Sequence, residues 1–253
     1  FRHGDHNVRI LLLAAGYATR MHPLTLNQSK PLLEVGGRAV ISRLLDALLA
    51  EGDVEEVVVV TNHKFAADFE EWSKSYTPTK GEAPAIRVID DGSMSDEDKL
   101  GAIGDIGLGM ASTEEDDWFV AAADNLLEND IKPQLELFRE HGDAVLTVRR
   151  VEGVIPPKTY GEVHVSDGLV TSFVEKPEVP SSDLVSIGLY LYPRKIAARV
   201  QEYLDAGNNP DAPGFFVAWL LERETVRSHL LEGLWWDIGS IETLEEPRAA
   251  YGS

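Results

Sequence analysis

Residues Leu12–Leu33 read LLAAGYATRMHPLTLNQSKPLL, and this stretch places small residues and two cations directly after an apolar run. The overlapping segment Val8–Leu13 is short, branched and almost entirely apolar, which is typical of a strand buried on both faces of a parallel sheet. The carboxyl end of such a strand opens onto a ligand crevice. The stretch is therefore predicted to be a strand followed by a loop that binds a triphosphate.

The side chains of this loop favour an anionic ligand. Small residues let backbone amides approach a phosphate closely, and glycine readily takes a positive φ. Arg20 can bind phosphate oxygens bidentately, whereas the ammonium of Lys30 is a movable point charge. As an isolated tripeptide, Ala-Ala-Gly is more typical of an ordinary turn. We predict that Arg20 and Lys30 are catalytic cations beside a nucleotide-binding loop of Leu13, Ala14, Ala15 and Gly16.

The whole stretch resembles the signature of the sugar-1-phosphate nucleotidyltransferases, or nucleotide-sugar pyrophosphorylases, LAAGxGTRLxPLTxxxPKxLLxV. Two positions depart from it, because Ala18 replaces the second glycine and Ser29 replaces the proline before the lysine. Alanine still allows close backbone approach but enters left-handed dihedrals less readily. Neither departure removes a charged group. The matching residues are Ala14, Ala15, Gly16, Thr19, Arg20, Pro23, Leu24, Thr25, Lys30, Leu33 and Val35.

A carboxylate follows a second apolar run, because FVAAA at 119–123 leads into Asp124. A strand end is where an α/β fold places its chemistry, and Mg²⁺ needs only a few carboxylates beside substrate phosphates. Asp124 is therefore predicted as a metal ligand, with an Asx turn as the alternative. The resemblance matches Asp124 to the family's metal motif. It matches WWDIG at 235–239 to the element that supplies a second ligand, Asp237; a buried aromatic turn is the alternative there.

The segment Leu169–Pro177, LVTSFVEKP, alternates apolar residues and ends in Glu175 and Lys176. On its own it is typical of a strand before a turn. It resembles the family's EKP motif, which implies that Lys176 holds the sugar phosphate. The resemblance also implies that Glu175 accepts hydrogen bonds from sugar hydroxyls.

Two further matches implied by the resemblance lie on either side of that segment. Tyr160 and Gly161 match the family's YG pair, and SIGLY at 186–190 matches its GxY strand. Gly161 and Gly188 would then let the sugar lie against backbone. These residues complete the predicted sugar-phosphate site.

The segment Gly101–Gly109, GAIGDIGLG, has the glycine content of a dinucleotide fingerprint but follows an acidic loop rather than a strand. It is predicted to be a helical segment that touches the base, where the family reads the nucleobase, with Gly101 as the contact. The histidines show no close metal-ligand spacing, so a zinc site is not expected.

The chain has 253 residues, a formal charge of −20 and no cysteine. The charge argues against a nucleic-acid partner, and disulfide and thiolate chemistry are excluded. No apolar run approaches the roughly 20 residues that span a bilayer, and the start FRHGDHN lacks a signal peptide's apolar segment. No membrane association and a cytoplasmic location are therefore expected. The acidic runs 96–98, 114–117 and 242–246 are interpreted as solvated loops and faces.

The alternation of buried strands with helical patterns predicts parallel strands joined by crossover helices. Strands are expected at 8–13, 56–61, 85–90 and 118–123, and helices at 38–50, 63–76 and 100–111. We predict one domain over 1–253, a doubly wound, Rossmann-like mixed α/β sheet. Its nucleotide-binding half is expected at about 8–150 and its sugar-phosphate half at about 151–253, with a small antiparallel sugar-binding lobe. No hexapeptide repeats appear, so a β-helix extension is not expected.

The resemblance implies transfer of a nucleoside monophosphate from a nucleoside triphosphate to a sugar 1-phosphate, with Mg²⁺ as cofactor. Three alternatives stay open: a cytidylyltransferase for phosphocholine or another non-sugar phosphate, a glycosyltransferase, and a catalytically silent nucleotide-sugar-binding protein. The absence of a DxD motif at Asp124 disfavours the glycosyltransferase, and the complete set of charged groups disfavours the silent protein. The sequence leaves open the base, the sugar and assembly into a homo-oligomer.

Overall fold

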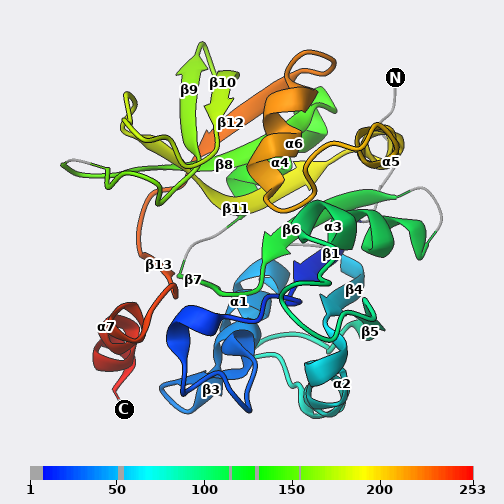
Figure 1. The fold of residues 1–253 in the computed structure, drawn as a ribbon, viewed down its shortest axis with the longest axis vertical. Helices are drawn as coiled ribbons and strands as arrows, with labels where there is room; N and C mark the ends of the chain where they lie inside the picture. The colour runs from blue at the N-terminus through cyan, green and yellow to red at the C-terminus, as the bar shows by residue number, and fades with distance from the viewer. Residues whose placement is uncertain (1–7, 51–53, 114–115, 129–130, 154, 253) are drawn as a thin grey trace.

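The computed structural model describes residues 8–50, 54–113, 116–128, 131–153 and 155–252. They form a mixed α/β fold, as the sequence predicts, built on a nine-stranded sheet (Figure 1). Residues 1–7, on which the expectation about a signal peptide rests, lie outside this part of the chain. Within the described ranges, no helix combines the length and the apolar character needed to cross a membrane.

Four parallel strands form the first part of the sheet. β1 lies parallel to β4 on one side and to β6 on the other, and β5 extends the sheet beyond β4. Most residues of β1 are buried, because helices cover both faces of this part of the sheet. The four strands are β1 (Val8–Leu13), β4 (Val54–Thr61), β5 (Ala85–Asp90) and β6 (Asp117–Ala122).

β11 (Leu184–Tyr192) joins this part of the sheet to the second part, because it is antiparallel to β6 and to β8. The order continues β8, β12, β10 and β9, and β9 also pairs with the start of β11. That last pairing closes five strands into a ring, seen in the upper part of Figure 1. The added strands are β8 (Ala144–Arg150), β9 (Glu162–Ser166), β10 (Leu169–Val174) and β12 (Val226–Leu230).

Three helices share a core cluster on one face of the sheet, and three others share a cluster on the opposite face. Side chains of β1 alternate between the clusters, with Ile10 and Leu12 in the first and Leu11 in the second, as a strand period of two requires. The first group is α1 (Val40–Leu49), α2 (Ala66–Ser75) and α4 (Lys132–His141). The second group is α3 (Ala102–Ala111), α5 (Lys195–Asp205) and α6 (Pro213–Leu220).

The predicted strands at 8–13 and 85–90 have the observed bounds. The helix predicted over 38–50 is shorter, because Arg38–Ala39 forms strand β3, which pairs with β2 (Glu34–Val35). The helix predicted over 63–76 begins as a 3₁₀ turn, whose first N–H groups need a cap; the Asn62 side chain accepts from Phe65 N–H at 3.2 Å. The last helix, α7 (Ile241–Tyr251), packs against β2 and β13 (Trp235–Asp237).

Candidate active site

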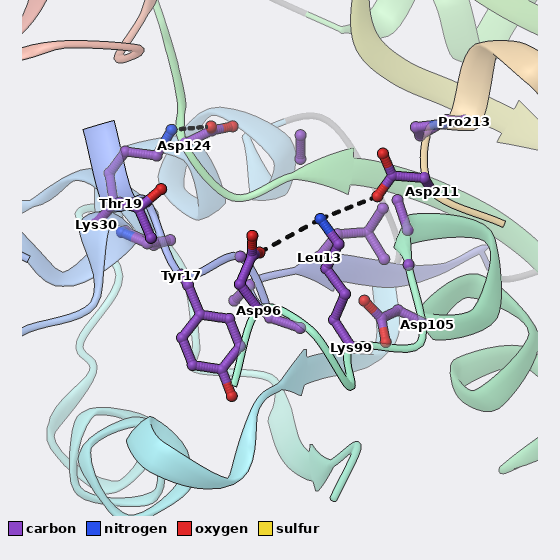
Figure 2. A pocket seen from close by; sticks show the side chains of 18 of the residues that line it. Leu13, Tyr17, Thr19, Lys30, Asp96, Lys99, Asp105, Asp124, Asp211 and Pro213 are labelled. Carbon is purple, nitrogen blue, oxygen red and sulfur yellow. Dashed lines mark hydrogen bonds and ion pairs between the residues drawn. The ribbon is translucent and has the colours of Figure 1, made fainter. Parts of the chain in front are cut away.

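A cavity of about 430 Å³ opens at the carboxyl ends of β1 and β6 (Figure 2). Its lining comes from the loop after β1, the start of α3 and the loop before α6. The predicted nucleotide-binding residues, both predicted catalytic cations and one predicted metal ligand line it together: Leu13, Ala14, Ala15, Gly16, Gly101, Arg20, Lys30 and Asp124.

Hydrogen bonds to β4 and the residue that follows it hold the loop after β1 in place. The Asn62 side-chain amide donates to the Ala15 carbonyl at 2.9 Å, and Ala14 N–H donates to the Val60 carbonyl at 2.8 Å. A Cβ atom built on Gly16 would meet nothing within 4 Å, so that backbone borders open space. A fixed loop with free room beside its amides suits a bound anion.

Ala18, which stands where the family signature has glycine, adopts the left-handed conformation, with φ 48° and ψ 42°. Its carbonyl accepts hydrogen bonds from the Thr25 hydroxyl at 2.8 Å and from Met21 N–H at 2.9 Å. These bonds hold the backbone in a conformation that is unfavourable for any residue with a Cβ atom. The alanine therefore retains the loop shape at a cost in stability.

Ala18→Gly is expected to raise the free energy of unfolding by up to about 1.6 kcal/mol, the difference between two opposing effects. Glycine removes a left-handed penalty of about 1–2 kcal/mol, while its freedom in the unfolded chain costs about 0.4–1 kcal/mol. Urea denaturation of both proteins measures the difference. A variant less stable than the parent by 1 kcal/mol or more, on the scale of these same terms, would contradict the explanation.

Lys30 begins the 3₁₀ helix η2 (Lys30–Leu32) and reaches Asp124 after β6, with 2.5 Å between Nζ and Oδ2. The side chains of this ion pair are 14% and 28% exposed, so solvent screens it only partly. Arg20, in the 3₁₀ helix η1 (Thr19–Met21), lines the same cavity. In the described part of the chain no carboxylate forms an ion pair with Arg20, which leaves its charge for an anionic ligand.

Strand pairing brings Asp237 to Asp124. Asp237 ends β13, which pairs with β7 (Asn125–Leu127), the short strand that begins just after Asp124. Ile238 N–H donates to the Asp124 carbonyl at 3.4 Å. Two carboxylates that lie far apart in the chain thus lie close together beside the cavity, as the family resemblance implies.

Several charged side chains lie close enough to Asp237 to shift the pKa of its carboxyl group. Burial raises the pKa of Asp237, and the neighbouring Asp124 carboxylate raises it further. The cations of Lys30, Arg20 and Lys176 oppose this shift, so all three act on the same carboxylate. A site with two carboxylates and three cations is arranged for polyanionic ligands that arrive with a metal ion.

Asp124 and Asp237 have the donor chemistry that fits Mg²⁺. Within the described ranges, no group of three or more His, Cys, Asp or Glu side chains could hold a metal ion. Mg²⁺ is commonly bound by one or two carboxylates together with waters and substrate phosphates. The pair therefore fits a magnesium ion that is shared with a phosphorylated ligand.

The predicted sugar-side residues are not among those that line the cavity, but two of them, Tyr160 and Lys176, lie close enough to Asp237 to interact with its charge. Burial and the Asp237 carboxylate raise the pKa of Tyr160, whose ring centre lies 6.1 Å from that of Trp235. Lys176 has a positive φ of 45°, and its Nζ lies 4.0 Å from Glu175 Oε1. The structure thus brings together the two sides of the site, while the role of each residue stays a prediction.

Gly161 and Gly188 have packing requirements of their own. A Cβ atom on Gly161 would overlap the Phe173 ring, and one on Gly188 would lie 3.2 Å from Ala122 Cβ at a φ of +73°. Both positions therefore require glycine whether or not a sugar lies beside them. Their predicted contact with the sugar remains a separate prediction.

Gly214 near the start of α6 is packed against the predicted sugar ligand Glu175. A Cβ atom there would overlap both Glu175 Oε2 and the Phe173 ring. Gly214→Ala is expected to lower the free energy of unfolding by about 1–3 kcal/mol, the usual cost of overpacking. Thermal unfolding measures the change, and an unaltered Tm would show that the Glu175 side chain moves away freely.

Five polar residues of the lining are not among the site residues predicted from the sequence: Tyr17, Asp96, Lys99, Asp105 and Asp211. Lys99 Nζ lies 3.3 Å from Asp96 and 3.0 Å from Asp211, as Figure 2 shows, and so links the loop before α3 to the loop before α6. Asp211 lies in NNPDAP, whose residues signal only a turn. No local motif could have identified it.

The interpretation of the acidic runs as solvated surface is wrong for Asp117, which is buried and accepts a hydrogen bond from Arg194 N–H at 2.9 Å. Asp96 is exposed in a loop, as predicted, and it also lines the open cavity. Run 114–117 lies partly outside the described residues, because 114–115 are not among them. Glu242, Glu245 and Glu246 are exposed, as predicted.

The family model described as nucleotidyl transferase matches residues 9–252, and the chain belongs to this family. It is 26% identical to the mannose-1-phosphate guanylyltransferase catalytic subunit beta of Drosophila pseudoobscura pseudoobscura, over 92% of this chain and 60% of the relative. It is 30% identical to the mannose-1-phosphate guanyltransferase of Candida albicans, over 90% of this chain and 60% of the relative. The chain thus spans about 60% of the length of these relatives.

Solved structures share the fold. A putative glucose-1-phosphate thymidylyltransferase from Bacillus anthracis, in complex with a sucrose, superposes with a TM-score of 0.80 at 22% identity, over 96% of this chain and 95% of that one. A UDP-glucose pyrophosphorylase complexed with UDP-glucose gives a TM-score of 0.80 at 21% identity, over 97% and 98%. At this identity the likeness concerns the fold alone.

Proposed function

We propose that this chain transfers a nucleoside monophosphate from a nucleoside triphosphate to a sugar 1-phosphate, giving a nucleoside diphosphate sugar and pyrophosphate. The observation that carries the proposal is the meeting of Lys30, Arg20 and Lys176 with the Asp124–Asp237 pair at one end of the sheet. Family membership and the names of the sugar-nucleotide-forming relatives support it.

In this proposal an oxygen of the sugar 1-phosphate attacks the α-phosphorus, and the bond from that phosphorus to the pyrophosphate oxygen breaks. The attacking group is already an anion near neutral pH, so no protein nucleophile is required. The main obstacle is repulsion between anions, which positioned cations reduce, and bound geometry aligns the reacting atoms. The protein's task is therefore electrostatic and positional.

The role proposed for each site residue follows from its position in the structure. The backbone of 13–16 and the Arg20 guanidinium bind the triphosphate, while Lys30 neutralises charge that develops at the α-phosphate. Asp124 and Asp237 would hold Mg²⁺, which would supply positive charge to the phosphates. Lys176 binds the sugar phosphate.

Glu175 favours a sugar over a non-sugar phosphate. Burial raises the pKa of this carboxyl group, which lies beside Lys176 and within the field of Asp211. A buried carboxyl group costs free energy unless a ligand or neighbour provides hydrogen bonds, and sugar hydroxyls would provide them. Phosphocholine offers no such donors. The division into a nucleotide half at about 8–150 and a sugar-phosphate half at about 151–253, within one doubly wound domain, is part of the same proposal.

The test is pyrophosphate release with Mg²⁺ across five nucleoside triphosphates and a panel of sugar 1-phosphates. GTP with mannose 1-phosphate comes first, since the relatives carry those substrates in their names. Phosphocholine serves as a non-sugar acceptor. Release that depends on a sugar 1-phosphate supports the proposal, release only with phosphocholine identifies a cytidylyltransferase, and no release with any pair contradicts nucleotidyl transfer to these acceptors.

A further inference from the structure

Two buried carboxyl groups bond to each other in the wall of the cavity. Asp105, on the first turn of α3, is 6% exposed and lines the cavity, and its side chain is hydrogen-bonded to that of Asp91, which follows β5. Within the described ranges, the buried atoms Asp105 Oδ1 and Asp91 Oδ2 accept no hydrogen bond from an N–H or hydroxyl group. Two carboxyl groups can share a hydrogen bond only while one of them is protonated. A single proton therefore holds the pair together.

Asp105 is the protonated member of the pair near neutral pH. Burial, followed by the charge and the hydrogen bond of Asp91, raises the pKa of Asp105 to about 8. When the proton leaves in mildly alkaline solution, two like charges face each other in a buried place, which is unfavourable. Attraction between α3 and the segment after β5 is then replaced by repulsion.

The elements that pack against α3 leave this titration to the pair itself. α3 packs chiefly against α5, α6, β1 and β4, and α6 carries no titratable side chain. Among the described residues, Asp91 is the charged group that shifts the pKa of Asp105. The titratable side chains of α5, β1 and β4 have partners of their own: Arg9 with Glu55 and Glu56, Lys195 and Arg199 with Glu224, Glu202 with Arg199, Tyr203 with the Asn209 carbonyl, and Asp205 with Gln201.

The charged groups on the cavity side are also paired. Lys99 pairs with Asp96 and Asp211, and Asp90, which precedes Asp91, pairs with His63. Burial and the charges of Asp91, Asp98 and Asp96 raise the pKa of Tyr17, so this phenol stays neutral over the same range of pH.

Hydrogen bonds connect the acid pair to the phosphate-binding loop. Asp91 Oδ1 accepts from both the N–H and the hydroxyl of Ser93 at 2.7 Å. The Ser93 carbonyl accepts in turn from the Tyr17 hydroxyl at 3.0 Å. Asp91 N–H donates to the Thr61 carbonyl at 2.8 Å, which anchors the segment after β5 to β4. That segment is thus fixed, and Asp105 fastens α3 to it.

The start of α3 is tied on its other side to the loop before α6. Ala102 N–H donates to the Asp211 carbonyl at 3.2 Å, and Ile103 N–H donates to the Pro210 carbonyl at 2.9 Å. Asp105 lies across the cavity from Lys30 (Figure 2). The position of α3 between these two attachments therefore sets the width of the cavity.

We propose that Asp105 and Asp91 are positioning residues, in which one shared proton holds the α3 wall against the segment after β5, so that nucleotide binding weakens when this proton is lost. The presence of a nucleotide in the cavity rests on the proposed function. Because coupling between two binding events is reciprocal, a bound nucleotide favours the protonated pair.

The experiment measures calorimetric binding of each of the five nucleoside triphosphates with Mg²⁺, from about pH 6.5 to about pH 9, on both sides of the titration. We expect the Kd of the parent to rise by about 5-fold or more, the low end of typical coupling between sites. Asp105→Asn keeps a donor to Asp91 but does not titrate, so its Kd should follow only the ionisation of the nucleotide. Asp91→Asn donates in the opposite direction and should behave alike.

Two further variants separate positioning from general effects. Asp105→Ala leaves Asp91 Oδ2 buried without a partner, so it should bind weakly at every pH, and recovery in Asp105→Asn would show that the hydrogen bond is what matters. Asp205→Asn, at the exposed end of α5, should keep the pH dependence of the parent.

Carbon-13 NMR of the aspartate carboxyl groups observes the shared proton directly, and a titration near pH 8 should disappear in Asp105→Asn. Binding that weakens with pH in the parent but not in Asp105→Asn supports the inference even if no pyrophosphate is released, which would contradict only the proposed function. Equal pH dependence of binding in the two proteins overturns the inference while leaving nucleotidyl transfer intact. The absence of any carboxyl group that titrates near pH 8 also overturns it.

Discussion

Lys30→Ala is expected to lower kcat/KM by about 10²- to 10³-fold, the usual loss when one preorganised electrostatic contact to a transition state is removed. Lys30 is largely enclosed and lies 2.5 Å from Asp124, so no solvent cation substitutes for it in the same position. Lys30→Arg should recover only part of the rate, since a planar guanidinium cannot follow the phosphate as a compact ammonium does. Steady-state pyrophosphate release measures both variants.

A second readout separates the two roles of Lys30. The ammonium competes with Mg²⁺ for the Asp124 carboxylate, so its removal should increase the thermal stabilisation that added Mg²⁺ provides. Lys74→Ala is the matched control, because Lys74 is 78% exposed and its ion pair with Glu70 lies on the surface of α2. Full activity in Lys30→Ala would remove the basis for the proposed reaction.

Asp237→Asn is expected to lower turnover by at least about 10²-fold without loss of stability. The carboxylate lies next to Asp124, and its removal relieves the repulsion between two partly buried anions. Tm should therefore equal or exceed that of the parent, whereas the Mg²⁺ concentration needed for half-maximal rate should rise. A loss of turnover accompanied by unfolding would show that Asp237 is structural.

The control for this variant is Asp205→Asn, which removes one charge from the exposed end of α5. Its rate and Mg²⁺ dependence should match those of the parent. Magnesium titration of Asp237→Asn at saturating substrate tests the ligand role directly. An unchanged titration midpoint would exclude Asp237 from the metal site.

The sequence predicts the parts of the site that lie within short motifs of recognisable chemical function. Lys30, Asp124 and the loop after β1 follow directly from residue type and spacing, and the structure brings them to one cavity. Asp237 needed the family resemblance, because its pairing partner Asn125 lies far away in the sequence, and local pattern carries no information about such pairing. The roles of these residues stay predictions until the variants are measured.

Other features could not be predicted because they depend on packing between distant segments. Asp96 is an exposed member of an acidic run, and nothing in that run indicates that it lines the cavity or that Lys99 pairs with both Asp96 and Asp211. The ring of five strands depends on β9 returning to β11, a contact that no period in the sequence indicates. Asp105 lies in a glycine-rich helix, and the sequence pattern of that helix does not indicate that Asp105 interacts with Asp91.

The antiparallel ladder between β6 and β11 has a consequence for how ligands enter and leave. Because this ladder joins the two parts of the sheet into one continuous sheet, the parts cannot move apart by a hinge motion without breaking backbone hydrogen bonds between β6 and β11. The frame around the cavity is therefore stiff, and passage depends on side chains at its rim. At that rim the Lys99–Asp211 ion pair, 3.0 Å long, joins the loop before α3 to the loop before α6, so these two loops are held together by side chains rather than by the sheet.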